Sequence, residues 1–416
     1  MSESQAPVPR STFLFMFITV LLSMVGFGII MPVMPDLLTE VTGKSVSEAA
    51  SLGGWLYFTY ALAQFVMSPI IGGLSDQFGR RPVLLVSLAM YAFDFLLLAL
   101  APTYGWLIVA RMLSGATAAT YSTANAVIAD VSPPEKRSAN FGLMGAAFGL
   151  GFIIGPAIGG FFGEMGTRAP FFAAAVVGFA NFIFGLIAFP ETNTNKRAFD
   201  WKRANPLGTL MSVTRYPIVL VVLGAFFLMQ FAHHSLPAVF AYFAKLKFDW
   251  SPAEIGYALT FVGVTAAVVQ GGLIRTLMPR LGEPRAVLLG ATAMTISFIG
   301  YAFFSPTGAY IYLWIGVGAL GGLMMPAMQG LMSSAVPEDG QGELQGAVSS
   351  VMSITMMFGP LVMTNIFTRY TDDQGVFLPG APLVLSAGLL VLAMVPFAMI
   401  VAKARTKAQA SEGASA

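Results

Sequence analysis

The side chains best suited to chemistry in this chain are a few ionisable residues inside long apolar segments. Asp94 follows Pro82 by twelve residues in a largely apolar run, which places it about 18 Å along a helix that starts at that proline. A charged residue at the centre of a membrane-spanning helix costs at least about 2.5–3.5 kcal/mol. An aspartate kept at this depth is typical of a group that carries protons or holds a cationic substrate. The alternative is a carboxyl that hydrogen-bonds neighbouring helices.

Three further ionisable residues lie within apolar runs. His233 and His234 stand just before Pro237, which should bend or break the helix that contains them. Histidine titrates near neutral pH and could handle protons; otherwise the ring packs and hydrogen-bonds a backbone carbonyl freed by the proline. Arg111 lies six residues into its run, so it either takes part in proton transfer or extends its charge to the membrane interface.

Uncharged polar residues also interrupt the apolar runs, and some of them should line a central cavity while others join helices. We predict a substrate cavity lined by Gln64, Asp94, Asn125, Gln230, His233 and Gln329.

The sequence contains no pattern typical of an enzyme or of a nucleic-acid-binding protein. It has no phosphate-binding loop of the Walker type, so ATP is not expected to drive it. Cysteine is absent, and two adjacent histidines lack the spacing and the neighbouring carboxylates of a metal site. We therefore expect no metal and no cofactor, with a proton gradient as the energy source.

The elements that must position these residues are membrane-spanning helices. Of the 416 residues, 56% are hydrophobic and 10% are charged, whereas soluble domains are about 25% charged. Continuous rather than alternating apolar runs exclude a β-barrel. We predict an all-α membrane protein with twelve transmembrane helices, at about 12–35, 50–72, 82–101, 105–128, 139–163, 170–190, 216–243, 253–275, 285–305, 308–334, 344–367 and 379–402.

The polar segments divide the chain into two pseudo-symmetric six-helix bundles. The bundles are predicted at 1–190 and 216–402, with a linker at 191–215 and a polar tail at 403–416. Gly72-Gly73-Leu74 recurs as Gly271-Gly272-Leu273, about 200 residues later, as in transporters built from duplicated halves. Most lysines and arginines fall on one side of the predicted helices, which places the linker and both termini in the cytoplasm.

The segment from Gly72 to Pro82 reads as a polar turn, with one helix ending at its glycines and the next starting at its proline. From Gly72 to Arg81 it resembles the loop between helices 2 and 3 of the major facilitator superfamily. That resemblance implies the twelve-helix fold and a charge cluster that latches the cytoplasmic ends of the two halves. The alternative is a topology signal and helix stop, which leaves Asp76 unexplained. The predicted latch residues are Gly72, Asp76, Gly79, Arg80, Arg81, Asp130 and Arg137.

Two other motifs carry the same resemblance. Arg111-Met112-Leu113-Ser114-Gly115 is similar to the superfamily's arginine motif in helix 4. The run from Gly151 to Gly160 is similar to the motif of its drug–proton antiporters, with Gly151, Gly155, Pro156, Gly159 and Gly160 at the motif positions. These glycines let a neighbouring helix approach closely.

Within the superfamily the chain most resembles the tetracycline efflux group, through the stretches 26–35, 60–65, 325–329 and 341–346. The resemblance implies a monomer in the cell inner membrane that exports an amphipathic, drug-like molecule in exchange for protons. The tetracycline exporters carry ionisable residues where this chain has Ser23, Ala266 and Thr295. These differences favour the alternative, a uniporter or uptake carrier for a small metabolite with little proton coupling.

Overall fold

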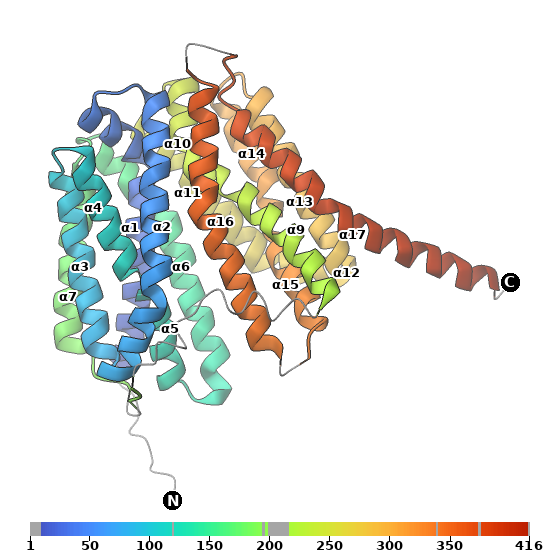
Figure 1. The fold of residues 1–416 in the computed structure, drawn as a ribbon, viewed down its shortest axis with the longest axis horizontal. Helices are drawn as coiled ribbons and strands as arrows, with labels where there is room; N and C mark the ends of the chain where they lie inside the picture. The colour runs from blue at the N-terminus through green and yellow to red at the C-terminus, as the bar shows by residue number, and fades with distance from the viewer. Residues whose placement is uncertain are drawn as a thin grey trace, which may run out of the picture. The chain divides into compact units, whose positions relative to one another are not determined.

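The computed structural model describes residues 10–118, 120–193, 196–198, 216–337, 340–372 and 376–414, and within those ranges the regular structure is helical (Figure 1). Eleven helical stretches among the described residues are long and apolar enough to cross a membrane, as expected for an all-α membrane protein. The helices of the first half are α1 (Arg10–Thr42), α2 (Val46–Phe78), α3 (Arg80–Leu100), α4 (Tyr104–Thr117), α5 (Thr120–Val131), α6 (Pro134–Gly163) and α7 (Ala169–Ala188). Those of the second half are α9 (Pro217–His233), α10 (Ser235–Phe248), α11 (Pro252–Val268), α12 (Ile274–Leu281), α13 (Glu283–Phe303), α14 (Ala309–Gly318), α15 (Met324–Ser334), α16 (Gln341–Arg369) and α17 (Ala381–Ala414).

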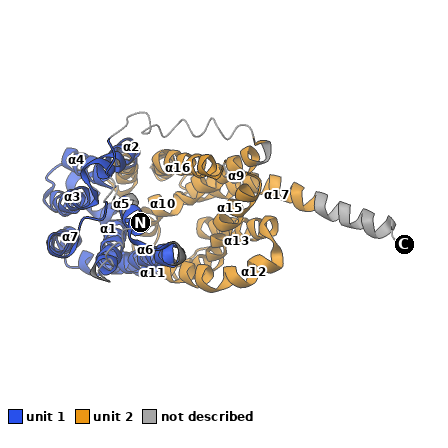
Figure 2. Ribbon diagram, turned by 90° about the horizontal axis from the view of Figure 1, so that it is seen from below, with its two compact units in different colours: residues 1–44, 59–205, 251–260 blue, residues 45–58, 206–250, 261–416 orange. Residues whose placement is uncertain are grey.

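The chain forms two compact units, coloured separately in Figure 2. Unit 1 holds residues 1–44, 59–205 and 251–260, and unit 2 holds residues 45–58, 206–250 and 261–416. In unit 1, α1 packs along α6 and α3 along α7; in unit 2, α13 packs along α17 and α9 along both α16 and α17. The first residues of α2 belong to unit 2 because they pack on α16, where Ser51 donates a hydrogen bond to Asn365 at 2.9 Å. The predicted bundles over 1–190 and 216–402 stay a prediction.

Several predicted helices are interrupted. The fourth, predicted over 105–128, corresponds to α4, which ends at Thr117, and α5, which begins at Thr120. The Thr117 hydroxyl bonds the Leu113 carbonyl at 2.9 Å, a contact that bends helices. The seventh is divided at His234 into α9 and α10. Pro237 causes this break, because it has no N–H to donate to the His233 carbonyl one turn earlier.

The eighth and tenth predicted helices each contain a segment that is not α-helical. Residues Val269–Leu273 form a π-helix and residues Ala319–Leu323 a 3₁₀-helix, and both segments end in Gly-Gly-Leu. They pack against each other, and a Cβ on Gly322 would lie 3.5 Å from Cγ1 of Val269. Glycine weakens the α-helix by about 1 kcal/mol, so these pairs allow the local change of helix type.

Several predicted helix ends were wrong. The first helix, predicted to end at residue 35, continues to Thr42. The helix predicted to stop at Gly72 continues to Phe78, and the next begins at Arg80, ahead of Pro82. The turn is therefore Gly79 alone, with φ 112°. The tail predicted at 403–416 continues α17 as a helix to Ala414. Most of the predicted linker at 191–215 lies outside the described residues.

Candidate functional site

Asp94 and Arg111 form a buried ion pair in unit 1. Nη2 of Arg111 lies 3.0 Å from Oδ2 of Asp94, and the side chains are 10% and 2% exposed. The hydroxyl of Ser114 donates to the same oxygen. Arg111 and Ser114 are one turn apart on α4 and so share the face that meets α3. The sequence indicated Asp94 and Arg111 separately; the structure brings them together and adds Ser114.

Two tyrosines surround this ion pair. The ring centroid of Tyr60, on α2, lies 6.0 Å from the guanidinium carbon of Arg111, within the range of a cation–π contact. Tyr91 lies one turn before Asp94 on α3 and donates to the Leu22 carbonyl of α1 at 2.9 Å. A Cβ on Gly26 would overlap the Tyr91 hydroxyl at 1.7 Å. The contact between α1 and α3 therefore requires a glycine at residue 26.

The ion pair is only partly satisfied by the described residues. Oδ1 of Asp94 and Nε of Arg111 are buried, and neither has a hydrogen-bond partner in the part of the chain that the structure describes. Buried polar atoms are nearly always paired in proteins. A carboxylate with one oxygen paired and one free is chemically suited to accept a proton or a cationic group without losing its contact to Arg111.

A second charge cluster joins α2, α3 and α5. Arg80 pairs with Asp76 through Nη1 at 2.6 Å and with Asp130 through Nε at 3.1 Å, and Nη1 also donates to the Ser75 hydroxyl at 3.1 Å. These are three of the predicted latch residues, and Ser75 is a member that the sequence did not indicate. The cluster is partly exposed, so each ion pair contributes only about 0–1 kcal/mol to stability.

The other predicted latch residues take no part in the two ion pairs of Arg80. Arg81 donates to the Leu186 carbonyl of α7 at 2.9 Å, and Arg137 donates to the Ala129 carbonyl of α5 at 3.3 Å. Gly79 forms the turn, whereas Gly72 is inside α2, where a Cβ would meet nothing within 4 Å. Gly72 thus has no steric reason to be glycine in this structure.

Known proteins resemble the chain along most of its length. Residues 16–360 and 235–414 match the family model of the Major Facilitator Superfamily. The chain belongs to the major facilitator superfamily. It is 36% identical over 350 residues to the class C tetracycline resistance protein of Escherichia coli, covering 84% of this chain and 88% of that protein. It is 35% identical over 389 residues to the class E protein of the same organism, covering 92% and 94%.

Solved structures show the same fold. The human organic anion transporter TETRAN matches with a TM-score of 0.68 at 21% identity, covering 94% of this chain and 100% of that structure. The nucleoside transporter NupG matches with a TM-score of 0.75 at 15% identity, covering 94% and 99%. This member of the superfamily is a multi-pass membrane transporter of a small molecule, not an enzyme, and belongs with the tetracycline resistance proteins.

The glycine motif of this superfamily member packs α6 against two other helices. Cβ atoms on three of its glycines would each lie within 2.6 Å of a backbone carbonyl oxygen of α1: Gly151 against Leu21, Gly155 against Val25 and Gly159 against Ile29. Gly160 instead meets the start of α11, where a Cβ would lie 2.8 Å from the Pro252 oxygen. Pro156 packs on Gly28 of α1. The motif thus permits close backbone contact on two sides.

The two histidines of the transporter lie where α9 ends. His233 is exposed and His234 half-buried. Cβ of His234 would be 2.9 Å from a Cβ added to Gly359 of α16. No hydrogen bond of a histidine ring to a freed carbonyl occurs among the described residues. The Ala232 carbonyl is taken by the Ser235 hydroxyl at 2.8 Å instead.

The polar residues predicted to line the transporter's cavity are spread over both units. Gln64 and Asn125 are half-buried on α2 and α5 of unit 1; Gln230 and Gln329 are half-buried on α9 and α15 of unit 2. Within the described part of unit 1, the side-chain hydrogen bonds of Asp94 go to Arg111 and Ser114. The cavity that these residues were predicted to line stays a prediction.

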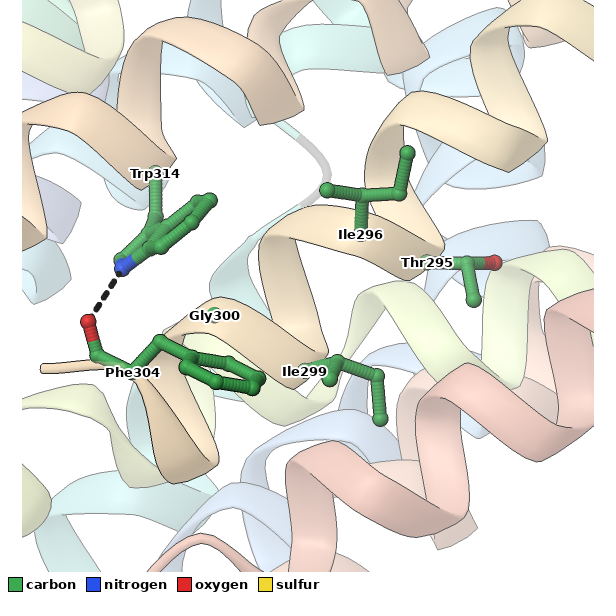
Figure 3. A pocket seen from close by; sticks show the side chains of 6 residues that line it. All are labelled: Thr295, Ile296, Ile299, Gly300, Phe304 and Trp314. Atoms are coloured by element: carbon green, nitrogen blue, oxygen red, sulfur yellow. Dashed lines mark hydrogen bonds between the residues drawn. The ribbon is translucent and has the colours of Figure 1, made fainter.

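An open apolar pocket of about 410 Å³ lies between α13 and α14 in unit 2 (Figure 3). Across it, Nε1 of Trp314 donates to the Phe304 carbonyl at 3.2 Å, and the indole covers Gly300, where a Cβ would lie 2.2 Å from the ring. The only hydroxyl in its lining, on Thr295, bonds the Ala291 carbonyl at 2.8 Å. The pocket therefore offers apolar surface and contains none of the predicted proton-handling residues. Its lining residues are Thr295, Ile296, Ile299, Gly300, Phe304 and Trp314.

Proposed function

We propose that this protein exports an amphipathic, tetracycline-like molecule across the cell inner membrane in exchange for protons. The observation that carries the proposal is the buried Asp94–Arg111 ion pair, with one carboxylate oxygen free of described partners, in a chain that matches tetracycline resistance proteins over most of its length. Ionisable residues within membrane segments mark ion and substrate pathways by default.

The proposal gives each group of residues a role. Asp94 is the main proton carrier and Arg111 its charge partner, with His233 and His234 as further proton-handling groups. The substrate binds near the polar residues Gln64, Asn125, Gln230 and Gln329, and the bundles over 1–190 and 216–402 give it access to each side of the membrane in turn. Both termini are cytoplasmic, no cofactor is needed besides the proton gradient, and the transporter works as a monomer.

Transport assays in purified lipid vesicles test the coupling. Adding tetracycline to proteoliposomes should move protons across the membrane in the direction opposite to the drug, and Asp94→Asn should abolish that movement. Drug accumulation in cells with and without the protein, over a panel of compounds, tests the substrate class. Full proton movement by Asp94→Asn would refute the assignment of Asp94.

A second candidate function is uniport or uptake of a small metabolite with little proton coupling. It is supported by two hydroxyl residues at positions where tetracycline exporters carry acidic groups. Ser23 donates to the Thr19 carbonyl and Thr295 to the Ala291 carbonyl, each at 2.8 Å on its own helix, and neither hydroxyl changes its charge near neutral pH as a carboxyl carrier does. Substrate movement without proton movement in the same vesicles would favour this candidate.

A further inference from the structure

The turn between α2 and α3 is bonded to the segment that follows α7. Glu191 lies three residues beyond Ala188, the last residue of α7. Its Oε1 accepts a hydrogen bond from the N–H of Arg80 at 2.8 Å, and its Oε2 accepts one from the N–H of Arg81 at 3.2 Å. One carboxylate therefore pairs two of the N–H groups that the first turn of a helix leaves without an intrahelical partner.

This contact explains why residue 79 is glycine. Gly79 has φ 112°, in the left-handed region that other residues rarely adopt. A Cβ at this position would also lie 2.2 Å from Oε2 of Glu191. The backbone angle and the close approach of the carboxylate each require glycine at residue 79, in the turn between α2 and α3.

The same segment also bonds the end of α2. The backbone carbonyl of Asp76 accepts hydrogen bonds from Nδ2 of Asn193 and from the N–H of Arg197, each at 3.1 Å. Glu191, Asn193 and Arg197 therefore hold the last turn of α2 and the first turn of α3, on either side of Gly79. These residues are the start of the connection between the two halves of the chain.

We propose that Glu191 is a positioning residue of the charge cluster formed by Asp76, Arg80 and Asp130. Its carboxylate binds the backbone of Arg80, the residue whose guanidinium pairs with both aspartates. Fixing this N–H fixes the start of α3 and hence the direction in which the Arg80 side chain leaves the helix. The negative charge is also favoured at this helix end by the helix dipole.

Hydrogen exchange on the full-length protein in lipid nanodiscs tests the contact directly. In Glu191→Ala the amides at the start of α3 should exchange about three- to thirtyfold faster, as expected for loss of a side-chain cap. Glu191→Gln keeps an oxygen acceptor without the charge and should restore part of the protection. Thr192→Ala is the matched control, because the Thr192 hydroxyl has no hydrogen-bond partner among the described residues. Equal protection in Glu191→Ala and wild type would overturn the proposal.

Transport kinetics separate positioning from general loss of structure. This readout rests on the proposed function, whereas the exchange readout does not, so an inactive wild-type protein would refute the first and leave the second standing. Glu191→Ala should lower kcat and leave KM unchanged, since Glu191 is not one of the predicted cavity residues and acts through Arg80. Gly79→Ala should be less harmful in the Glu191→Ala background, where the clash with the carboxylate is gone. Unchanged kcat, or strictly additive effects, would count against a positioning role.

Discussion

Removing either member of the Asp94–Arg111 ion pair should destabilise the transporter at least as much as removing both. Arg111→Gln leaves a carboxylate that is 2% exposed with Ser114 as its described partner, and Asp94→Asn leaves a buried guanidinium. Breaking a buried pair in this way costs about 3–5 kcal/mol. The double variant buries no net charge, so we expect it to be no less stable than either single variant.

These values give a coupling energy of about 3 kcal/mol or more between the two residues. Chemical unfolding of the four proteins in mixed micelles, followed by circular dichroism, measures it. The exposed pair of Arg168 and Glu40, with atoms 2.9 Å apart and side chains 30% and 44% exposed, is the matched control and should give about 0–1 kcal/mol.

Transport should respond differently from stability. Asp94→Asn and the double variant should both lose proton coupling, because neither has a carboxylate at residue 94, although the double variant restores charge balance. Additive losses of stability would show that the two side chains do not share one buried pair. A double variant that still transports in a pH-dependent way would remove Asp94 from the mechanism.

Three other predictions follow from the packing and the surface charges. Asp76→Ala should lower the unfolding free energy by less than about 1 kcal/mol, because the residue is half exposed, yet it should slow turnover; equal losses of inserted protein and of transport would contradict this. Gly155→Ala should lower the thermal unfolding temperature because its Cβ would lie 2.6 Å from the Val25 oxygen, whereas Gly149→Ala, with nothing within 4 Å, is the harmless control. Hydrogen bonds from the Ser251 side chain and the Ala253 N–H lower the pKa of the Glu164 carboxyl below 4.5. Glu164 should therefore stabilise the protein above that pH and lose this effect as the pH falls through its lower folded pKa, so thermal unfolding of wild type and Glu164→Gln should converge in acid.

The sequence was sufficient to predict the helical membrane fold and the single residues that stand out from it. Asp94 and Arg111 could be found because a charge in an apolar run is rare. Their pairing could not be found, because residues seventeen positions apart on two helices meet only if both helices have the right rotation about their axes. Ser114 belongs to the arginine motif that begins at Arg111. Only the structure shows that its hydroxyl lies on the same face of α4 as Arg111 and bonds Asp94.

The ends of the helices were harder to predict than their existence. Gly72 and Gly73 suggested a helix end, but a glycine weakens a helix by only about 1 kcal/mol, and the helix continues to Phe78. Glu191 was missed for a related reason. It is an acidic residue in a polar segment, and its partners are backbone N–H groups at residues 80 and 81, which no pattern of side chains can indicate.

The packing around α1 links the glycine motif to the surroundings of Asp94. Gly26 lies against Tyr91 of α3, and Gly28, two residues later, lies against Pro156 of α6. Because protein interiors are close-packed, α6 cannot shift along α1 without changing the space at Gly28, and α1 cannot move without changing the Tyr91 contact one turn from Asp94. The geometry therefore gives a physical route by which a change in helix packing at the motif alters the surroundings of the buried carboxylate. The pH dependence of transport in Gly28→Ala, compared with Gly149→Ala, measures the strength of this coupling.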